Sequence, residues 1–199
     1  ENFNLMKYLR EEYFEFKKMN RMKTPYLLMD YIKYDGAPDP LKFLNKENTY
    51  LGFVAKMERD EELSNLLEDQ AFFKILKEFS SKLPIKRVYE FSIIKYLLSN
   101  EGISLDKSKG EILKYIEDVD NESIIHALNC LNGTYYDSAQ NKNNMKSFNY
   151  IDGNLSTTVD FRRIVGNKKY RIYIEDVINY GLVRYEKEFG SKYYGVPFF

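Results

Sequence analysis

His126 and Cys130 are the two side chains whose types and spacing come closest to a reactive pair. They stand four positions apart, so on a helix both would lie on one face. A structural zinc site needs about four ligands, and the chain contains no further histidine or cysteine. A nucleophilic cysteine needs a base beside it in a cleft, which a single helical turn seldom provides. We therefore expect an ordinary side of a helix, with no catalytic residue and no metal site.

Four acidic residues gather between two expected helices: Glu117, Asp118, Asp120 and Glu122. Carboxylate oxygens bind divalent cations, but the spacing lacks the glycine and terminal glutamate of a calcium-binding loop. Acidic side chains also stabilise the N-terminus of a following helix. We expect this second role, and an enzyme with a carboxylate metal site remains an alternative.

Glycine-rich phosphate-binding loops are absent from the sequence. The ten glycines are scattered and form neither the P-loop pattern nor the dinucleotide-binding pattern. We therefore expect no cofactor, and no hydrolysis of nucleotide by this chain alone.

Basic residues cluster in two places, around Lys82, Lys86 and Arg87 and again between positions 162 and 171, where Tyr170 and Tyr173 are interleaved. Basic side chains neutralise phosphates, and aromatic rings stack on exposed bases. The alternative is a solvated charged face. The candidate nucleic-acid contacts are Lys142, Lys146, Arg162, Arg163, Lys168, Lys169 and Arg171.

Direct reading of bases is not expected. The segment 121–132 carries Glu122 as its one acidic or basic residue besides His126, and Asn129 and Asn132 are its main groups suited to base edges. The whole chain has 30 basic and 30 acidic residues, so net charge does not indicate a nucleic-acid partner either.

The composition is typical of a globular protein with a substantial core: 199 residues, 44% hydrophobic and 16% aromatic. A single cysteine fits a reducing cytoplasm. No apolar run is long enough to span a bilayer and no signal peptide is visible, so we expect no membrane partner. The chain begins without methionine, which leads us to expect an interior fragment of a longer protein.

Apolar spacing predicts a succession of helices. Asp39-Pro40 starts a buried turn, and Gly181 inside the last helix predicts a close contact with another helix. The polar segment 134–156 is either a mobile loop or a wing with strands at 135–136 and 148–150 and a turn at Asp152-Gly153. The expected helices cover 3–20, 25–34, the stretch from Thr49, 61–82, 87–99, the stretch from Ser104, 121–132, the stretch from Thr157 or Thr158, and 169–189.

Three successive short helices from residue 87 to residue 132 match the order of a helix-turn-helix or winged-helix core. We predict a mainly α fold, with a helical bundle over residues 1–84 and a winged-helix-like helical half over 85–199 that contains at most short strands. The two parts are either separate domains or one continuous domain.

One set of positions carries a resemblance to a known family: Pro25 with Leu28, Asp30-Tyr31, Asp39-Pro40, Phe43, Tyr50 with Phe53, Lys86-Arg87 with Glu90, Tyr185 to Phe189, and Pro197-Phe198. These positions resemble a segment of large bacterial superfamily-two helicases. In that family a phospholipase D-like nuclease domain comes first, a DEAD/DEAH-type motor second and a C-terminal domain of unknown function last. The resemblance places this chain between the motor and the last domain.

The motor's nucleotide-binding motifs and the nuclease's histidine–lysine motifs are absent here, so the resemblance transfers no catalytic residue. It implies a non-catalytic accessory module of a DNA helicase. We expect an interdomain scaffold with sequence-independent contacts to the DNA backbone, whose partners are DNA and other domains of the parent chain. A protein–protein interaction domain that uses exposed aromatic residues is the first alternative.

Overall fold

The computed structural model describes residues 4–21, 23–44, 49–112, 119–132 and 147–189. Helices dominate and the strands are short, which confirms the mainly α prediction. The α-helices are α1 (Leu5–Met19), α2 (Tyr50–Glu58), α3 (Glu61–Leu67), α4 (Gln70–Ser80), α5 (Tyr89–Leu97), α6 (Leu105–Ile112), α7 (Asn121–Leu131), α8 (Val159–Val165) and α9 (Lys168–Phe189). The 3₁₀ helices are η1 (Leu28–Tyr31) and η2 (Pro40–Phe43), and the strands are β1 (Gly102–Ser104), β2 (Phe148–Ile151) and β3 (Asn154–Thr157).

Side-chain caps start several helices where the sequence predicts them. The hydroxyl of Thr49 accepts a hydrogen bond from Gly52 N–H at 3.1 Å at the start of α2. Thr158, rather than Thr157, caps α8. Asp39 caps η2, and Pro40 occupies its first position, where the missing N–H costs nothing.

The prediction of one helix over 61–82 is wrong, because Asp69 divides it into α3 and α4. The Asp69 carboxylate accepts hydrogen bonds from Ala71 N–H at 3.1 Å and Phe72 N–H at 3.4 Å and so begins a new helix. The predicted helix over 25–34 is shorter than expected, since only η1 forms there.

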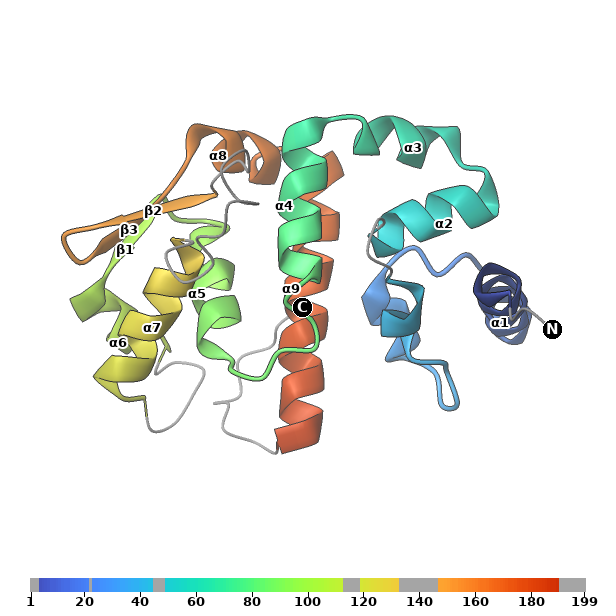
Figure 1. The fold of residues 1–199 in the computed structure, drawn as a ribbon, viewed down its shortest axis with the longest axis horizontal. Coiled ribbons are helices and arrows are strands. Elements are labelled where there is room, and N and C mark those ends of the chain that lie inside the picture. Colours follow the sequence, from blue (N-terminus) through green and yellow to red (C-terminus); the bar gives the residue numbers. More distant parts are fainter. Residues whose placement is uncertain (1–3, 22, 45–48, 113–118, 133–146, 190–199) are drawn as a thin grey trace.

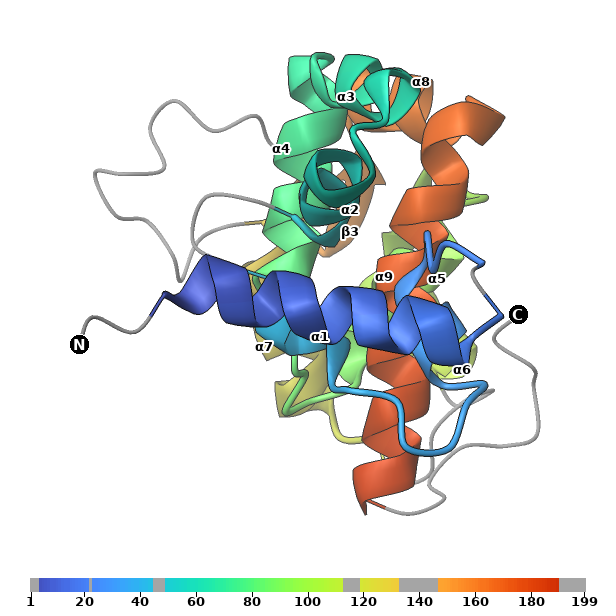
Figure 2. The same cartoon turned by 90° about the vertical axis from the view of Figure 1, so that its right-hand side faces the viewer.

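α4 and α9 run side by side through the middle of the molecule (Figure 1). The elements from α1 to α3 lie on one side of this pair, and α5 to α8 with the sheet lie on the other. α1 runs roughly perpendicular to α9 (Figure 2). The central pair is therefore in a position to contact both halves of the fold.

Gly181 lets α9 approach α5 closely. A Cβ atom at this position would lie 2.4 Å from Phe91 Cε2 and 3.0 Å from Leu83 Cδ2. This confirms the predicted close helix contact, since only a residue without a side chain fits against that ring.

The three strands form one antiparallel sheet in the order β1-β3-β2. The predicted strand near 148–150 and the turn at Asp152-Gly153 are confirmed, and both turn residues have positive φ, at 51° and 78°. Residues 154–156 are not a loop, because they belong to β3, which pairs with both other strands. The strand predicted at 135–136 lies outside the described residues.

Buried apolar side chains from both halves belong to one hydrophobic cluster. Phe43 stacks on Phe53 in the N-terminal part, with ring centroids 4.7 Å apart. Phe148 packs against Phe161 in the C-terminal part, at 4.9 Å. The division between residues 84 and 85 stays a prediction.

Candidate functional site

Arg163, a predicted nucleic-acid contact, is engaged by the protein itself. Its Nη1 and Nη2 donate to the two carboxylate oxygens of Asp69 at 3.0 and 3.1 Å. Tyr170 Oη donates to the same carboxylate at 3.1 Å. These hydrogen bonds join α8 and α9 to the start of α4, so the structure gives Arg163 a role in the fold.

Arg162 and Arg171 also bind partners within the chain. Arg162 Nη1 donates to Thr157 O at 2.5 Å and to Thr157 Oγ1 at 3.1 Å. Arg171 Nε donates to Glu175 Oε1 at 2.6 Å, and its Nη1 donates to Leu98 O at 2.8 Å. The second contact satisfies a carbonyl at the end of α5, so this arginine ties α5 to α9.

Lys168 and Lys169 differ from these arginines. Both are exposed at the start of α9, and neither takes part in an ion pair with the residues that the structure describes. Cations at a helix N-terminus oppose the helix dipole, so the two lysines do not stabilise α9. Lys142 and Lys146 lie outside the described residues. The structure therefore leaves Lys168 and Lys169 as the predicted contacts best placed for an external anion.

The chemistry considered for His126 and Cys130 has little structural support. Cys130 Sγ lies 3.5 Å from His126 Nε2, but Cys130 is 6% exposed, and burial raises the pKa of its thiol. A raised pKa disfavours the thiolate, which is the nucleophilic form. Within the described ranges, no three His, Cys, Asp or Glu side chains are grouped to hold a metal ion. Asp120 accepts a hydrogen bond from Ser123 N–H at 2.8 Å and caps α7, whereas Glu117 and Asp118 lie outside the described residues.

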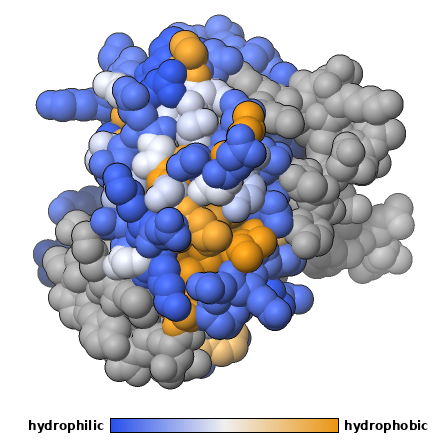
Figure 3. All heavy atoms as spheres, turned by 90° about the vertical axis from the view of Figure 1, so that its left-hand side faces the viewer, coloured by the Kyte–Doolittle hydropathy of each residue, from blue (hydrophilic) through white to orange (hydrophobic). Residues whose placement is uncertain are grey.

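The exposed side of α7 carries Asn121, Glu122 and Ile125, with Asn129 half-buried on the same side, and we call this surface the α7 face. No lysine or arginine lies on α7. Figure 3 views the molecule from the side of α6, α7 and the sheet, and apolar side chains gather in its lower half with polar ones around them. The exposed charged residues here lie on α6, on α7 with its N-cap Asp120, and in the β2–β3 turn. They are Asp106, Lys107, Lys109, Asp120, Glu122 and Asp152. Among the described residues, this side therefore combines an apolar cluster with polar surroundings whose exposed charges are slightly acidic in sum.

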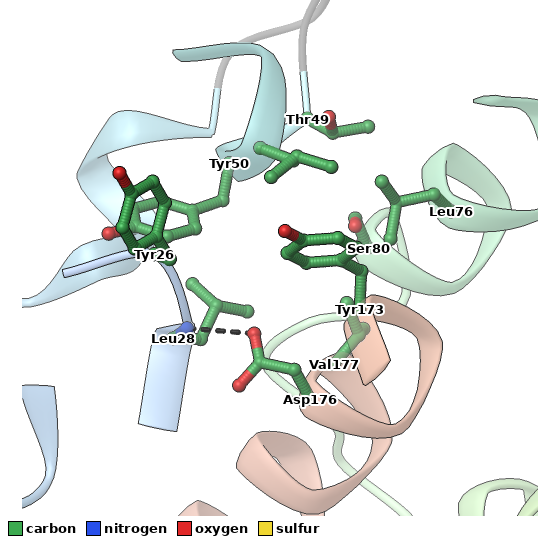
Figure 4. A pocket seen from close by; sticks show the side chains of 10 residues that line it. Tyr26, Leu28, Thr49, Tyr50, Leu76, Ser80, Tyr173, Asp176 and Val177 are labelled. Carbon is green, nitrogen blue, oxygen red and sulfur yellow. Dashed lines mark hydrogen bonds between the residues drawn. The ribbon is translucent and has the colours of Figure 1, made fainter. Parts of the chain in front are cut away.

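The carboxyl group of Asp176 on α9 is buried, with 6% of the residue exposed. Its Oδ2 accepts a hydrogen bond from Leu28 N–H at 2.7 Å, drawn in Figure 4, and its Oδ1 accepts one from Met29 N–H at 3.0 Å. Burial outweighs these hydrogen bonds and raises the pKa of the carboxyl group to about 7.

A small cavity of about 10 Å³ lies beside Asp176, among side chains from α2, α4, α9 and the η1 segment. Tyr173, Ser80 and Thr49 bring hydroxyl groups to its wall (Figure 4). The space suits about one water molecule, whereas pockets for small-molecule ligands measure about 300 Å³ or more. It is therefore no substrate pocket.

A wider open groove of about 480 Å³ lies between α2, α3 and α4. Gly52 and Ala55 line it on α2, and Leu67 and Phe73 line it on the other two helices. Of the described residues, Lys56 is the one charged side chain in its wall. The groove thus lacks the paired titratable groups that acid–base catalysis uses.

A family model described as "Domain of unknown function (DUF8090)" matches residues 9–188. The chain belongs to the DUF8090 family. No curated protein and no solved structure matches it. The DUF8090 region begins within α1 and ends within α9, so it includes both halves of the fold.

The sequence did not indicate two features of this DUF8090 domain. The first is the buried carboxyl group of Asp176 on α9. Its N–H partners lie about 150 positions earlier in the chain. The one available signal was an acidic residue directly before Val177 and Ile178, two apolar residues of that helix. For the α7 face, the sequence shows only that residues 121–132 have few groups that bind bases.

None of the described helices has the length and apolar character needed to cross a membrane.

Proposed function

We propose that this DUF8090 domain is a non-catalytic accessory module of a bacterial DNA helicase in the cytoplasm. In this proposal it is an interdomain scaffold, and its α7 face docks on another domain of the parent polypeptide. The helicase context rests on the sequence resemblance given above. The docking surface rests on the arrangement of α5 to β3.

The order α5, β1, α6, α7, β2, β3 is typical of a winged-helix unit, and the sheet order β1-β3-β2 agrees with that interpretation. In DNA-binding helix-turn-helix proteins the helix equivalent to α7 lies in the major groove and contacts base edges. Here that helix exposes Ile125 and Glu122 and no basic residue, which favours a protein surface over a phosphate backbone. This property of α7 is the single observation that carries the docking proposal.

The first part of the test is the genomic reading frame. A superfamily-two motor encoded upstream of this segment is expected, and a frame without one would contradict the helicase context. The second part uses the intact polypeptide and a truncated form that lacks this domain. The isolated domain is titrated into the truncated form, and the dissociation constant is measured by calorimetry.

Ile125→Asp should weaken this binding by about tenfold or more, since a charge would be buried in an apolar contact. Ile172→Asp is the matched control, because Ile172 is an isoleucine 49% exposed on α9 rather than on α7. Equal affinity of the wild type and Ile125→Asp would contradict docking through this surface.

A second candidate function is sequence-independent contact with the DNA backbone where α8 meets α9. The observation that favours it is the exposed pair Lys168 and Lys169, which have no ion-pair partner in the described ranges. Counterion release would drive such a contact, so its affinity must fall as salt rises.

A further inference from the structure

Asp176 connects two parts of the chain that are distant in sequence. Through Leu28 N–H and Met29 N–H, its carboxylate holds the first turn of η1 against α9. A second link nearby joins Arg184 of α9 to Asp39 at η2, with nitrogen–oxygen distances of 2.8 and 2.9 Å. The Asp39–Arg184 pair is partly exposed, whereas Asp176 is buried.

Among the residues that the structure describes, no ion pair includes Asp176, so no cation there compensates the buried carboxylate directly. Lys33 acts on it only at a distance, and Asp30 on η1 opposes its ionisation. The other titratable groups that face it or line the adjoining cavity are tyrosines, while α4 contributes Leu76 and Ser80, which do not titrate. These tyrosines are Tyr26 before η1, Tyr50 on α2, and Tyr173 and Tyr180 on α9.

We propose that Asp176 is a protonation-dependent latch: the charge on this one carboxyl group sets how firmly the η1 segment is held on α9. The protonated carboxyl group is accommodated in the closed arrangement. The ionised group is buried with two backbone N–H donors and without an ion-pair partner among the described residues, so it favours an opened arrangement in which water reaches it. This latch is independent of the proposed function.

The direction of the effect follows from linkage. Closure raises the pKa of Asp176 to about 7, whereas a solvated aspartate titrates near 3.9. A group with a raised pKa in the closed state contributes its full stability below the pKa of the open state and loses it as pH rises through the closed-state pKa. The latch therefore loosens as pH rises from about 4 to about 7. Above pH 7 it loosens no further, because Asp176 is then ionised in both arrangements.

Amide hydrogen exchange at Leu28 and Met29 tests the latch in the full chain. After correction for intrinsic exchange, the opening equilibrium should increase by about tenfold or more between pH 5 and pH 8. Asp176→Asn should remove this pH dependence, because an amide does not ionise. Asp30→Asn, the same chemical change on η1, should retain most of it. The proposal would be overturned if Asp176→Asn kept the pH dependence. It would also be overturned if both variants lost the pH dependence equally.

A direct titration keeps the proposal falsifiable if Asp176→Asn does not fold. The Asp176 carboxyl carbon of the wild type can be followed by NMR between pH 3 and pH 9. A midpoint well above 5 is expected. A midpoint at or below about 4, the ordinary value for aspartate, would overturn the latch.

Discussion

Asp69 and Arg163 form a bidentate ion pair that connects α8 to the beginning of α4. Both guanidinium nitrogens donate to the carboxylate, at 3.0 and 3.1 Å, and the same carboxylate accepts the hydrogen bonds that start α4. A residue that the sequence suggests for DNA contact is thus part of the internal structure.

Replacing Asp69 by alanine should destabilise the protein by about 1 kcal/mol or more, because α4 loses its cap. Arg163 and Tyr170 would lose a partner as well. Urea unfolding followed by circular dichroism measures the change. Glu68→Ala is the control, since Glu68 is an exposed acidic residue directly before Asp69. Equal free energies of unfolding for the two variants would show that the Asp69 cap does not stabilise the protein.

The same carboxylate should make stability depend on acid pH. The Arg163 guanidinium beside Asp69 lowers the pKa of that carboxyl group to about 2. Because the folded-state pKa is depressed, its contribution is present above the unfolded value near 4 and is lost as pH falls through 2. Unfolding free energies of the wild type and Asp69→Asn, measured from pH 6 down to pH 2, should converge. A difference that stays constant to pH 2 would contradict the shift.

Gly181→Ala should destabilise the protein although alanine favours helices. The added Cβ would lie 2.4 Å from a ring carbon of Phe91, and overpacking of this kind costs about 1–3 kcal/mol. The matched control is Gly110→Ala on α6, where no heavy atom lies within 4 Å of the new Cβ. There the gain in helix propensity should stabilise by up to about 1 kcal/mol. Thermal melts of both variants test the pair, and a stabilised Gly181→Ala would contradict the packing described.

Lys168 and Lys169 should account for any contact with DNA in the described part of the chain. Mobility shifts with duplex DNA at low salt should weaken in the variant with both lysines changed to alanine. The control changes Lys107 and Lys109 on α6 to alanine, two exposed lysines on another surface. If the wild type does not bind, or binds equally at low and high salt, the second candidate function is rejected.

Local signals in the sequence account for much of the fold. Apolar spacing and capping residues such as Thr49 depend on neighbours a few positions away, so they can be recognised without a structure. The break at Asp69 was missed because apolar residues continue on both sides of it with helical spacing. The helix at 25–34 was overestimated for a related reason: the chain pairs η1 with Asp176 of α9 instead of extending it.

The candidate sites were harder to predict because they depend on contacts between distant segments. A run of arginines near residue 163 indicates positive charge, but not that Asp69 lies opposite it. In the same way, Asp176 is one acidic residue among many until the fold buries it next to Leu28. The small number of base-binding groups in residues 121–132, in contrast, depends on side-chain types alone and is evident in the sequence.

Hydrogen exchange along α7 provides the most direct test of the scaffold proposal. The intact polypeptide is compared with the isolated domain, and the amides of residues 121–131 are followed by mass spectrometry. Docking through the α7 face predicts slower exchange there in the intact protein, and Ile125→Asp should abolish the difference. Identical exchange of α7 in the two proteins would contradict the account.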